Sequence, residues 1–218
     1  MGRITLVCTV HNERGLCNEN ELLRILEAIG PEVIFEEIRP SDFQSYYADK
    51  SKHTLEMRTV GRYLKRKTGR QVPVDDFVIP EGFRRDLDIL FDYVESNNIE
   101  YSELIAERDQ KTHHLGFRYL NSPEFKALSK NVCESFEKFI AKSGRDDLKK
   151  SLLTWNDMMR RRENSMLKNI YDFCRNSPFT EGMFLVGAGH MSSVCENIEG
   201  RMNTETKLID WNIGKLPD

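Results

Sequence analysis

Two mainly apolar runs at opposite ends of the chain each end in a histidine. Residues 4–10 lead to His11, and residues 183–189 lead to His190. Runs of this kind are typical of strands buried in a parallel sheet. Because ligands bind at the carboxyl ends of such strands, the pattern predicts that the two imidazoles share one site. The alternative is that they are unrelated loop residues.

The segment after the first run predicts a βαβ unit. Asn18 and Glu21 have the spacing of a capping box, so a helix should begin there. Gly30 should end that helix, and residues 33–38 then form a second short strand. Strand, helix and strand in so few residues predict a right-handed crossover and therefore parallel strands.

The middle of the chain has a mostly helical pattern. Residues 41–70 are expected to be helical, and residues 71–78 to form a short or edge strand, since Pro73 cannot donate to a sheet ladder. A large helical insertion follows over about residues 82–176. Its expected breaks are at residues 97–98, 121–123 and 143–144.

The last elements return to the sheet. Ser193 and Glu196 resemble a second capping box, which predicts a helix ending near Gly200, and residues 207–211 predict a last strand. The whole pattern predicts one α/β domain over residues 1–218. Its mainly parallel central sheet should be flanked by helices and carry the helical insertion.

Composition limits the expected partners. The chain has 32 Lys and Arg against 35 Asp and Glu, a net charge of −3, which gives no general attraction to nucleic acid or anionic membranes. No apolar run reaches the roughly 20 residues of a membrane helix, and no signal-peptide pattern begins the sequence. We therefore expect a soluble, cytoplasmic protein with a small-molecule or peptide substrate, and with neither nucleic acid nor membrane as partner. Oligomeric state is not indicated.

Two further features have ordinary interpretations. The basic cluster over residues 58–70 is interpreted as a solvated helix end rather than a nucleic-acid site. The five cysteines form no C-x-x-C pair, so we expect reduced thiols that are mostly buried. The alternative for Cys195 is a reactive thiol beside His190.

Three charged residues fall in apolar surroundings. Glu36 and Glu37 follow the apolar start of the second strand, where a buried carboxylate needs a partner. The alternative is that the strand ends at Phe35 and both acids are solvated. Arg162 lies on the apolar stripe of a long helix, and a guanidinium there needs a carboxylate, carbonyls or an anion unless it extends to solvent. The stripe consists of Leu152, Trp155, Met159, Met166, Ile170 and Phe173.

Four motifs in this order resemble the TraB and Tiki proteins, which belong to the superfamily of erythromycin esterase and the haem-binding ChaN proteins. The motifs are x-x-x-His at residues 8–11, a strand ending in acid at residues 33–37, Arg162 with Met166, and Gly-Ala-Gly-His at residues 187–190. In that superfamily the first motif is Gly-x-x-His, and Cys8 replaces the glycine here. The resemblance implies a parallel α/β core with a helical insertion. It also implies a site built from both histidines, the strand acid at Glu37 and the arginine.

The chemistry of these side chains agrees with hydrolysis. Some members of the superfamily resemble metal-dependent hydrolases, including a protease, whereas others bind or regulate. Two imidazoles and a carboxylate can hold a divalent ion with open positions, and such an ion acidifies bound water. We therefore predict a metal-assisted hydrolase of an ester or amide bond, with Mn, Co or Zn held by His11, Glu37 and His190.

The remaining predicted roles are catalytic. Glu36 or Glu37 would supply the base, and Arg162 would stabilise a developing oxyanion. A metal-free version uses one histidine as base and the other as acid, and the helix start after His190 favours a neutral imidazole. The alternative function is a non-catalytic protein that binds a small molecule or signal in the same pocket.

Overall fold

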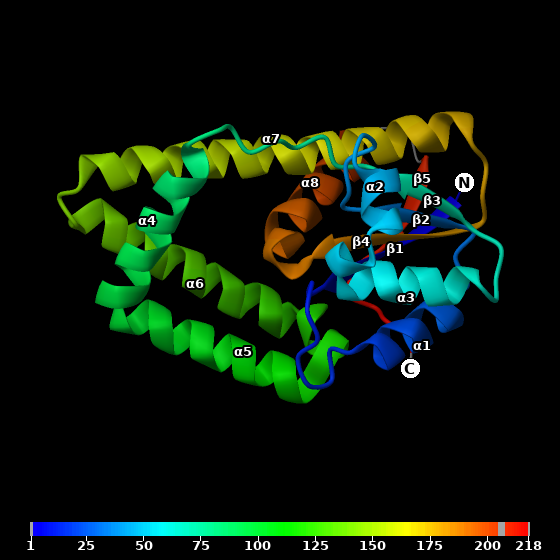
Figure 1. Cartoon of the computed structure of the whole chain (residues 1–218), viewed down its shortest axis with the longest axis horizontal. Coiled ribbons are helices and arrows are strands. Elements are labelled where there is room, and N and C mark those ends of the chain that lie inside the picture. Colours follow the sequence, from blue (N-terminus) through cyan, green and yellow to red (C-terminus); the bar gives the residue numbers. More distant parts are fainter. Residues whose placement is uncertain (1, 205–207, 218) are drawn as a thin grey trace.

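A parallel sheet lies in one half of the molecule, on the right in Figure 1. The computed structural model describes residues 2–204 and 208–217. Within them the sheet has five strands in the order β3-β2-β4-β1-β5, and every neighbouring pair is parallel. The predicted α/β fold with a mainly parallel sheet is therefore confirmed. The strands are β1 (Gly2–Thr9), β2 (Val33–Glu36), β3 (Arg70–Pro73), β4 (Glu181–Gly187) and β5 (Ile209–Asn212).

Helices cover both faces of this sheet. Helices α1 and α3 lie side by side below it in Figure 1, and α7 (Asp146–Asn176) and α8 lie on the other side. The predicted first helix begins as expected, because the Asn18 side chain accepts hydrogen bonds from the N–H groups of Asn20 and Glu21. Gly30 ends it in the left-handed conformation. The helices and 3-10 turns outside the helical insertion are α1 (Glu19–Ile29), α2 (Phe43–Ala48), η1 (Lys50–Lys52), α3 (Leu55–Leu64), η2 (Ala188–His190) and α8 (Met191–Thr204), of which η1 and η2 are the 3-10 turns.

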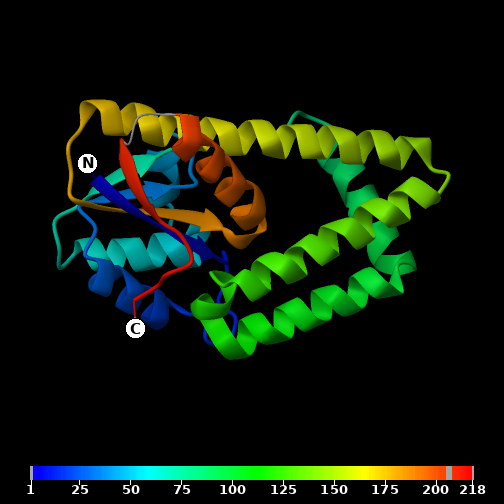
Figure 2. The ribbon, with the colours of Figure 1, turned by 180° about the vertical axis from the view of Figure 1, so that it is seen from behind.

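The helical insertion extends from the sheet as an arm, which Figure 2 shows from behind. It consists of α4 (Phe83–Asn97), α5 (Ile99–Leu120), α6 (Pro123–Lys142) and α7 (Asp146–Asn176), so the three predicted breaks are confirmed. The arm has a hydrophobic core separate from that of the sheet, centred on Leu90, Val94 and Ile140. Helix α7 belongs to both, because Leu148 lies in the arm core and Ile170 in the sheet core.

Several predicted boundaries were wrong. The second strand ends at Glu36 and the third at Pro73, and the helix expected over residues 41–70 is broken into α2, η1 and α3. Helix α8 begins at Met191 rather than at Ser193, whose hydroxyl instead donates to the carbonyl of His190 one turn earlier. The predicted last strand begins at Ile209, and Lys207 lies outside the described residues.

The arm is joined to the end of β1 by the C-terminal part of α5. Asn121 accepts a hydrogen bond from the Cys8 N–H at 2.8 Å and donates to the Cys8 carbonyl at 3.1 Å. Helix α5 is kinked at Gly116, which has a φ of 66°. A methyl group there would lie 2.9 Å from Cβ of Leu16, so the close approach requires glycine. The loop after β1 is thereby held in place.

The predicted basic cluster lies mainly on α3. Arg58 and Arg62 both contact Glu19 of α1, and Arg66 contacts Glu27. Three members of the cluster thus join α3 to α1 through two acids of α1. None of the helices in the described part of the chain combines the length and the apolar character that crossing a membrane requires.

Candidate functional site

The carboxyl edge of the sheet gathers the predicted residues. Strands β1 and β4 are neighbours, with Thr9 paired to Gly187, so His11 and His190 follow adjacent strands. Glu37 follows β2, which pairs with the other side of β4. Arg162 reaches this edge from α7, at the point where that helix passes from the arm to the sheet.

Glu37 is the centre of the cluster. One carboxylate oxygen contacts Arg162 Nη2 and lies 3.4 Å from His190 Nε2, and the other accepts the Gly187 N–H at 2.7 Å. Burial alone would raise the pKa of Glu37, but the histidine, the guanidinium and the backbone N–H lower it to about 2. Glu37 is therefore an ionised carboxylate throughout the neutral range.

Arg162 is held by two carboxylates. Its Nε and Nη2 donate to Asp75 Oδ2 at 3.0 and 2.7 Å, and Nη2 also contacts Glu37. The predicted pairing of Arg162 with the strand acids is thus present for Glu37, with Asp75 as an additional partner. The side chain is 18% exposed and does not extend into solvent. Its Nη1 has no carboxylate partner within the described residues.

His190 lies between two acids. Its Nδ1 is 2.8 Å from Glu163 Oε1, and its Nε2 faces Glu37. Burial opposes protonation, but the hydrogen bonds to Glu163 and Glu37 raise the pKa of His190 to about 9. The expected neutral imidazole was wrong, because two carboxylates outweigh the field of the helix that follows. In the protonated ring Nε2 is a donor, so Arg162 Nη1 at 3.3 Å is a second donor nearby and not a hydrogen-bond partner.

His11 has a different environment. Its Nδ1 lies 3.2 Å from Glu56 Oε1, and the same oxygen accepts the Thr9 hydroxyl at 2.6 Å. The hydrogen bond to Glu56 raises the pKa of His11, against the effect of burial. The imidazole is 60% exposed, and Nε2 has no hydrogen-bond partner within the described residues. Glu56 thus orients the His11 ring through Nδ1, while Nε2 stays accessible.

Glu36 is buried beside this cluster rather than within it. Its oxygens accept hydrogen bonds from the hydroxyl of Tyr47 and from the amide of Gln71. Burial raises the pKa of Glu36 to about 7, although both hydrogen bonds oppose the shift. The alternative in which both strand acids are solvated was wrong, because Glu36 is 2% exposed and the Glu37 side chain 9%.

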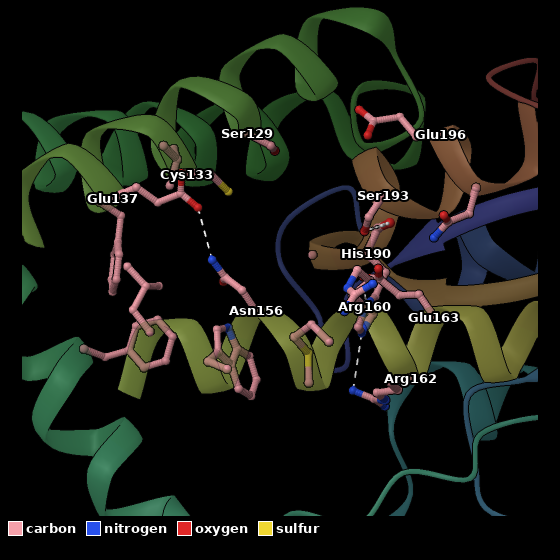
Figure 3. A pocket seen from close by; sticks show the side chains of 18 of the residues that line it. Ser129, Cys133, Glu137, Asn156, Arg160, Arg162, Glu163, His190, Ser193 and Glu196 are labelled. Atoms are coloured by element: carbon pink, nitrogen blue, oxygen red, sulfur yellow. Dashed lines mark hydrogen bonds and ion pairs between the residues drawn. The ribbon is translucent and has the colours of Figure 1, made fainter. Parts of the chain in front are cut away.

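The site is divided into two pockets. The smaller, of about 220 Å³, is lined by His11, Glu36, Glu37 and Arg162. The larger, of about 620 Å³, lies in the arm and is lined by His190 together with Arg162 (Figure 3). The expectation that one pocket would contain all five residues was wrong, because His11 lines only the smaller pocket and His190 only the larger, while Arg162 lines both.

The side chains do not fit a divalent ion in this arrangement. Both oxygens of Glu37 are occupied by Arg162 and Gly187, and a protonated His190 has no lone pair for a metal. Among the described residues, no group of three His, Cys, Asp or Glu is placed to hold a metal ion. A metal held by His11, Glu37 and His190 therefore stays a prediction that would require Arg162 to move.

Three side chains of the site were not predicted from the sequence. Asp75 follows β3 as Glu37 follows β2, so the strand-end rule applied to the third strand would have found it. Glu163 lies four residues after Met159 and three before Met166, a position on the same helical stripe as Arg162. Glu56 is in the first turn of α3, where an acid is common in any helix, and no signal distinguished it.

Cys195 is a core residue. It is 2% exposed, and burial raises the pKa of its thiol, which keeps it protonated and unreactive. Cys8 and Cys17 are also buried, whereas Cys133 is exposed. The expectation of mostly buried thiols is therefore confirmed for Cys8, Cys17 and Cys195.

Comparisons with models of protein families, with curated proteins and with solved structures found no match to this chain. The resemblance to the TraB and Tiki proteins therefore stays a prediction. The assignment of function depends on the geometry of the strand-end residues.

Proposed function

We propose that the protein hydrolyses an ester or amide bond, with His11 as general base. The observation that carries the proposal is the contact between His11 Nδ1 and Glu56, which leaves Nε2 open toward the pocket that contains Arg162. A carboxylate on one ring nitrogen orients the imidazole and stabilises its protonated form, while the other nitrogen accepts a proton. Glu56 is thus a positioning residue and His11 a catalytic one.

The attacking water would lie next to Gly187, in the space that a side chain at this position would occupy. An atom built at the Cβ position of this glycine would be 3.8 Å from His11 Nε2 and 3.3 Å from Glu37 Oε2, so both groups reach the space around it. His11 takes one proton from the water while the oxygen of that water forms a bond to the carbonyl carbon of the substrate. The same proton then passes from His11 to the leaving oxygen or nitrogen as the old bond breaks. The products are a carboxylic acid and an alcohol or amine.

Arg162 would stabilise the negative charge that develops on the carbonyl oxygen. Asp75 and Glu37 fix the guanidinium through Nε and Nη2, and Nη1 keeps hydrogens that no carboxylate occupies. A donor held in place before the reaction is the usual means of stabilising such an oxyanion. His190 and Glu163 complete the support, because the protonated ring contacts Glu37 from the far side.

The proposed hydrolysis requires neither a metal ion nor membership of the family that the sequence resembles. A divalent ion, if bound, would supply Lewis-acid activation of water, and no step above depends on it. Each assay is therefore run with EDTA and with added Mn²⁺, Co²⁺ or Zn²⁺. Activation by one of these ions would support the metal-dependent version that the resemblance implies.

His11→Gln is the first test. With p-nitrophenyl acetate as the probe, the substitution should lower kcat/KM by about a hundredfold or more, the size of a lost general base. The matched control is His114→Gln, which removes an exposed histidine of α5 outside both pockets and should leave the rate unchanged. Equal rates for the two variants would contradict the assignment of His11.

A second candidate function is binding without catalysis. It is favoured by the internal pairing of the cluster, in which Glu37, Asp75 and Glu163 all contact Arg162 or His190. Such a cluster also supports a rigid ligand pocket. Saturable ligand binding with no ester hydrolysis above the His11→Gln background would favour this function.

A further inference from the structure

The larger pocket lies between α6 and α7 and extends away from the sheet. Figure 3 shows His190 and Glu163 close together at the end near α8, and Glu137 and Asn156 reaching toward each other from the two helices farther out. A volume of about 620 Å³ is within the range of small-molecule sites. Since Arg162 lines both pockets, a substrate that reacts beside His11 can place another part of itself here.

The outer part of this pocket is aromatic. The ring of Phe91 lies 5.4 Å from that of Phe136 and 6.1 Å from that of Trp155, and Tyr101 lies 5.4 Å from Phe136. Phe91 and Trp155 are only half-buried although they pack on the arm core. Their uncovered ring surfaces face the pocket, and such surfaces favour contact with another ring or an alkyl chain.

The charges around the pocket disfavour an anion. Two of the three arginines that line it are closely paired with acids that do not, Arg160 with Asp157 and Arg162 with Glu37 and Asp75. The third, Arg108, lies 3.8 Å from Asp109, which Arg14 also holds at 2.9 Å. Of the lining acids, Glu137 and Glu196 have no ion-pair partner within the described residues. A carboxylate beside Glu137 or Glu196 would therefore meet an acid that no cation pairs with in the described part of the chain.

We propose that the substrate carries an aryl-alkyl group without negative charge, and that this group lies between α6 and α7 while the scissile bond lies at Arg162. This inference rests on the proposed hydrolysis for the position of the scissile bond. The hydroxyl of Ser129, a residue that also lines the pocket, is buried and has no hydrogen-bond partner among the described residues.

The test uses Trp155 as its reporter. Three probes without a scissile bond are titrated, namely 4-phenylbutan-1-ol, 4-phenylbutylamine and 4-phenylbutanoate, while tryptophan fluorescence is recorded. The alcohol and the amine should give saturable changes that Trp155→Phe abolishes. The carboxylate should bind at least about tenfold more weakly, a difference of about 1.4 kcal/mol. No saturable change, or equal affinity for all three probes, would overturn the proposal.

A blocking variant locates the binding. Asn156→Phe places a ring in the pocket from an exposed helical position, and Leu153→Phe places one on the same helix at a 70% exposed residue outside it. The first should raise the Kd for 4-phenylbutan-1-ol by about tenfold or more, and the second by less than about twofold. Equal effects of the two substitutions would also overturn the proposal.

Hydrolysis is measured separately with p-nitrophenyl 4-phenylbutanoate and p-nitrophenyl acetate. The longer ester should have the higher kcat/KM, and Asn156→Phe should remove that preference. His11→Gln should lower kcat/KM by about a hundredfold or more without changing the fluorescence titration. Binding without turnover would refute the proposed hydrolysis and leave the pocket assigned, whereas turnover without binding would refute the pocket alone.

Discussion

Arg162 joins the helical arm to the strand ends through contacts with Glu37 and Asp75. Asp75 accepts from Nε and Nη2 of the planar guanidinium, Glu37 contacts Nη2 as well, and both carboxylates are buried. A planar fork can satisfy two acids at once, whereas an ammonium is a single compact charge. The geometry of this residue therefore matters more than its charge.

Arg162→Lys should lower kcat/KM for p-nitrophenyl acetate by an amount equivalent to about 1–3 kcal/mol, the scale of a hydrogen bond to a charged group. The free energy of unfolding, measured with urea, should fall on the same scale, because Asp75 and Glu37 lose part of their pairing. The matched control is Arg161→Lys, since that side chain is 78% exposed and its ion pair among the described residues is with Asp157. Indistinguishable variants would remove Arg162 from the site.

Residues of the site differ in how far the sequence reveals them. Glu37 and Arg162 were predictable because each interrupts an apolar pattern, and a buried charge needs a partner. Glu56 was not, because its role depends on α3 lying beside the end of β1, a tertiary contact without a local signature. The protonation of His190 depends in the same way on Glu163 and Glu37, which reach it from other elements.

Among the elements, α5 is the clearest case of a local rule overridden by packing. Its sequence predicts a continuous helix, yet Gly116 adopts a φ of 66° and the helix bends against the loop after β1. The bend lets the Leu16 N–H donate to the His113 carbonyl at 2.9 Å. The position of the loop that carries His11 thus depends on a kink in the arm.

Gly116→Ala should destabilise the protein by about 1–3 kcal/mol, since alanine is strained in this conformation and its methyl would press on Leu16. The control is Gly61→Ala in α3, where the added methyl meets nothing within 4 Å. That change should stabilise the protein by up to about 1 kcal/mol, because glycine is a poor helix former. Urea unfolding measures both, and a loss of stability in Gly61→Ala equal to that in Gly116→Ala would contradict this account.

Element boundaries in the arm were predicted better than those near the site. The breaks at Asn98, Ser122 and Gly144 follow from capping and turn residues, which act locally. The start of α8 did not follow, because Ser193 has the sequence of a cap while the 3-10 turn η2 leads directly into the helix at Met191. A local signal cannot show that a preceding turn already begins the helix.

At the scale of the whole molecule, two hydrophobic cores share one long helix. Helix α7 contributes Leu148 to the arm and Met166, Leu167 and Ile170 to the sheet, so the site lies where the two cores meet. The parallel sheet was predictable from strand length and order. The position of β4 between β1 and β2 was not, because strand neighbours depend on how distant segments pair. That order places Glu37 beside Gly187 and makes the cluster compact.

The central claim is that Glu56 holds His11 as a general base, and the pH dependence of kcat/KM tests it most directly. Glu56 raises the pKa of His11 above the ordinary value of 6.5, so activity should be lost as the pH falls through a midpoint above 6.5. Glu56→Gln removes the charge but keeps an oxygen that can accept from Nδ1, so its midpoint should move to lower pH while activity at high pH persists. A midpoint that is unchanged by Glu56→Gln would contradict the claim.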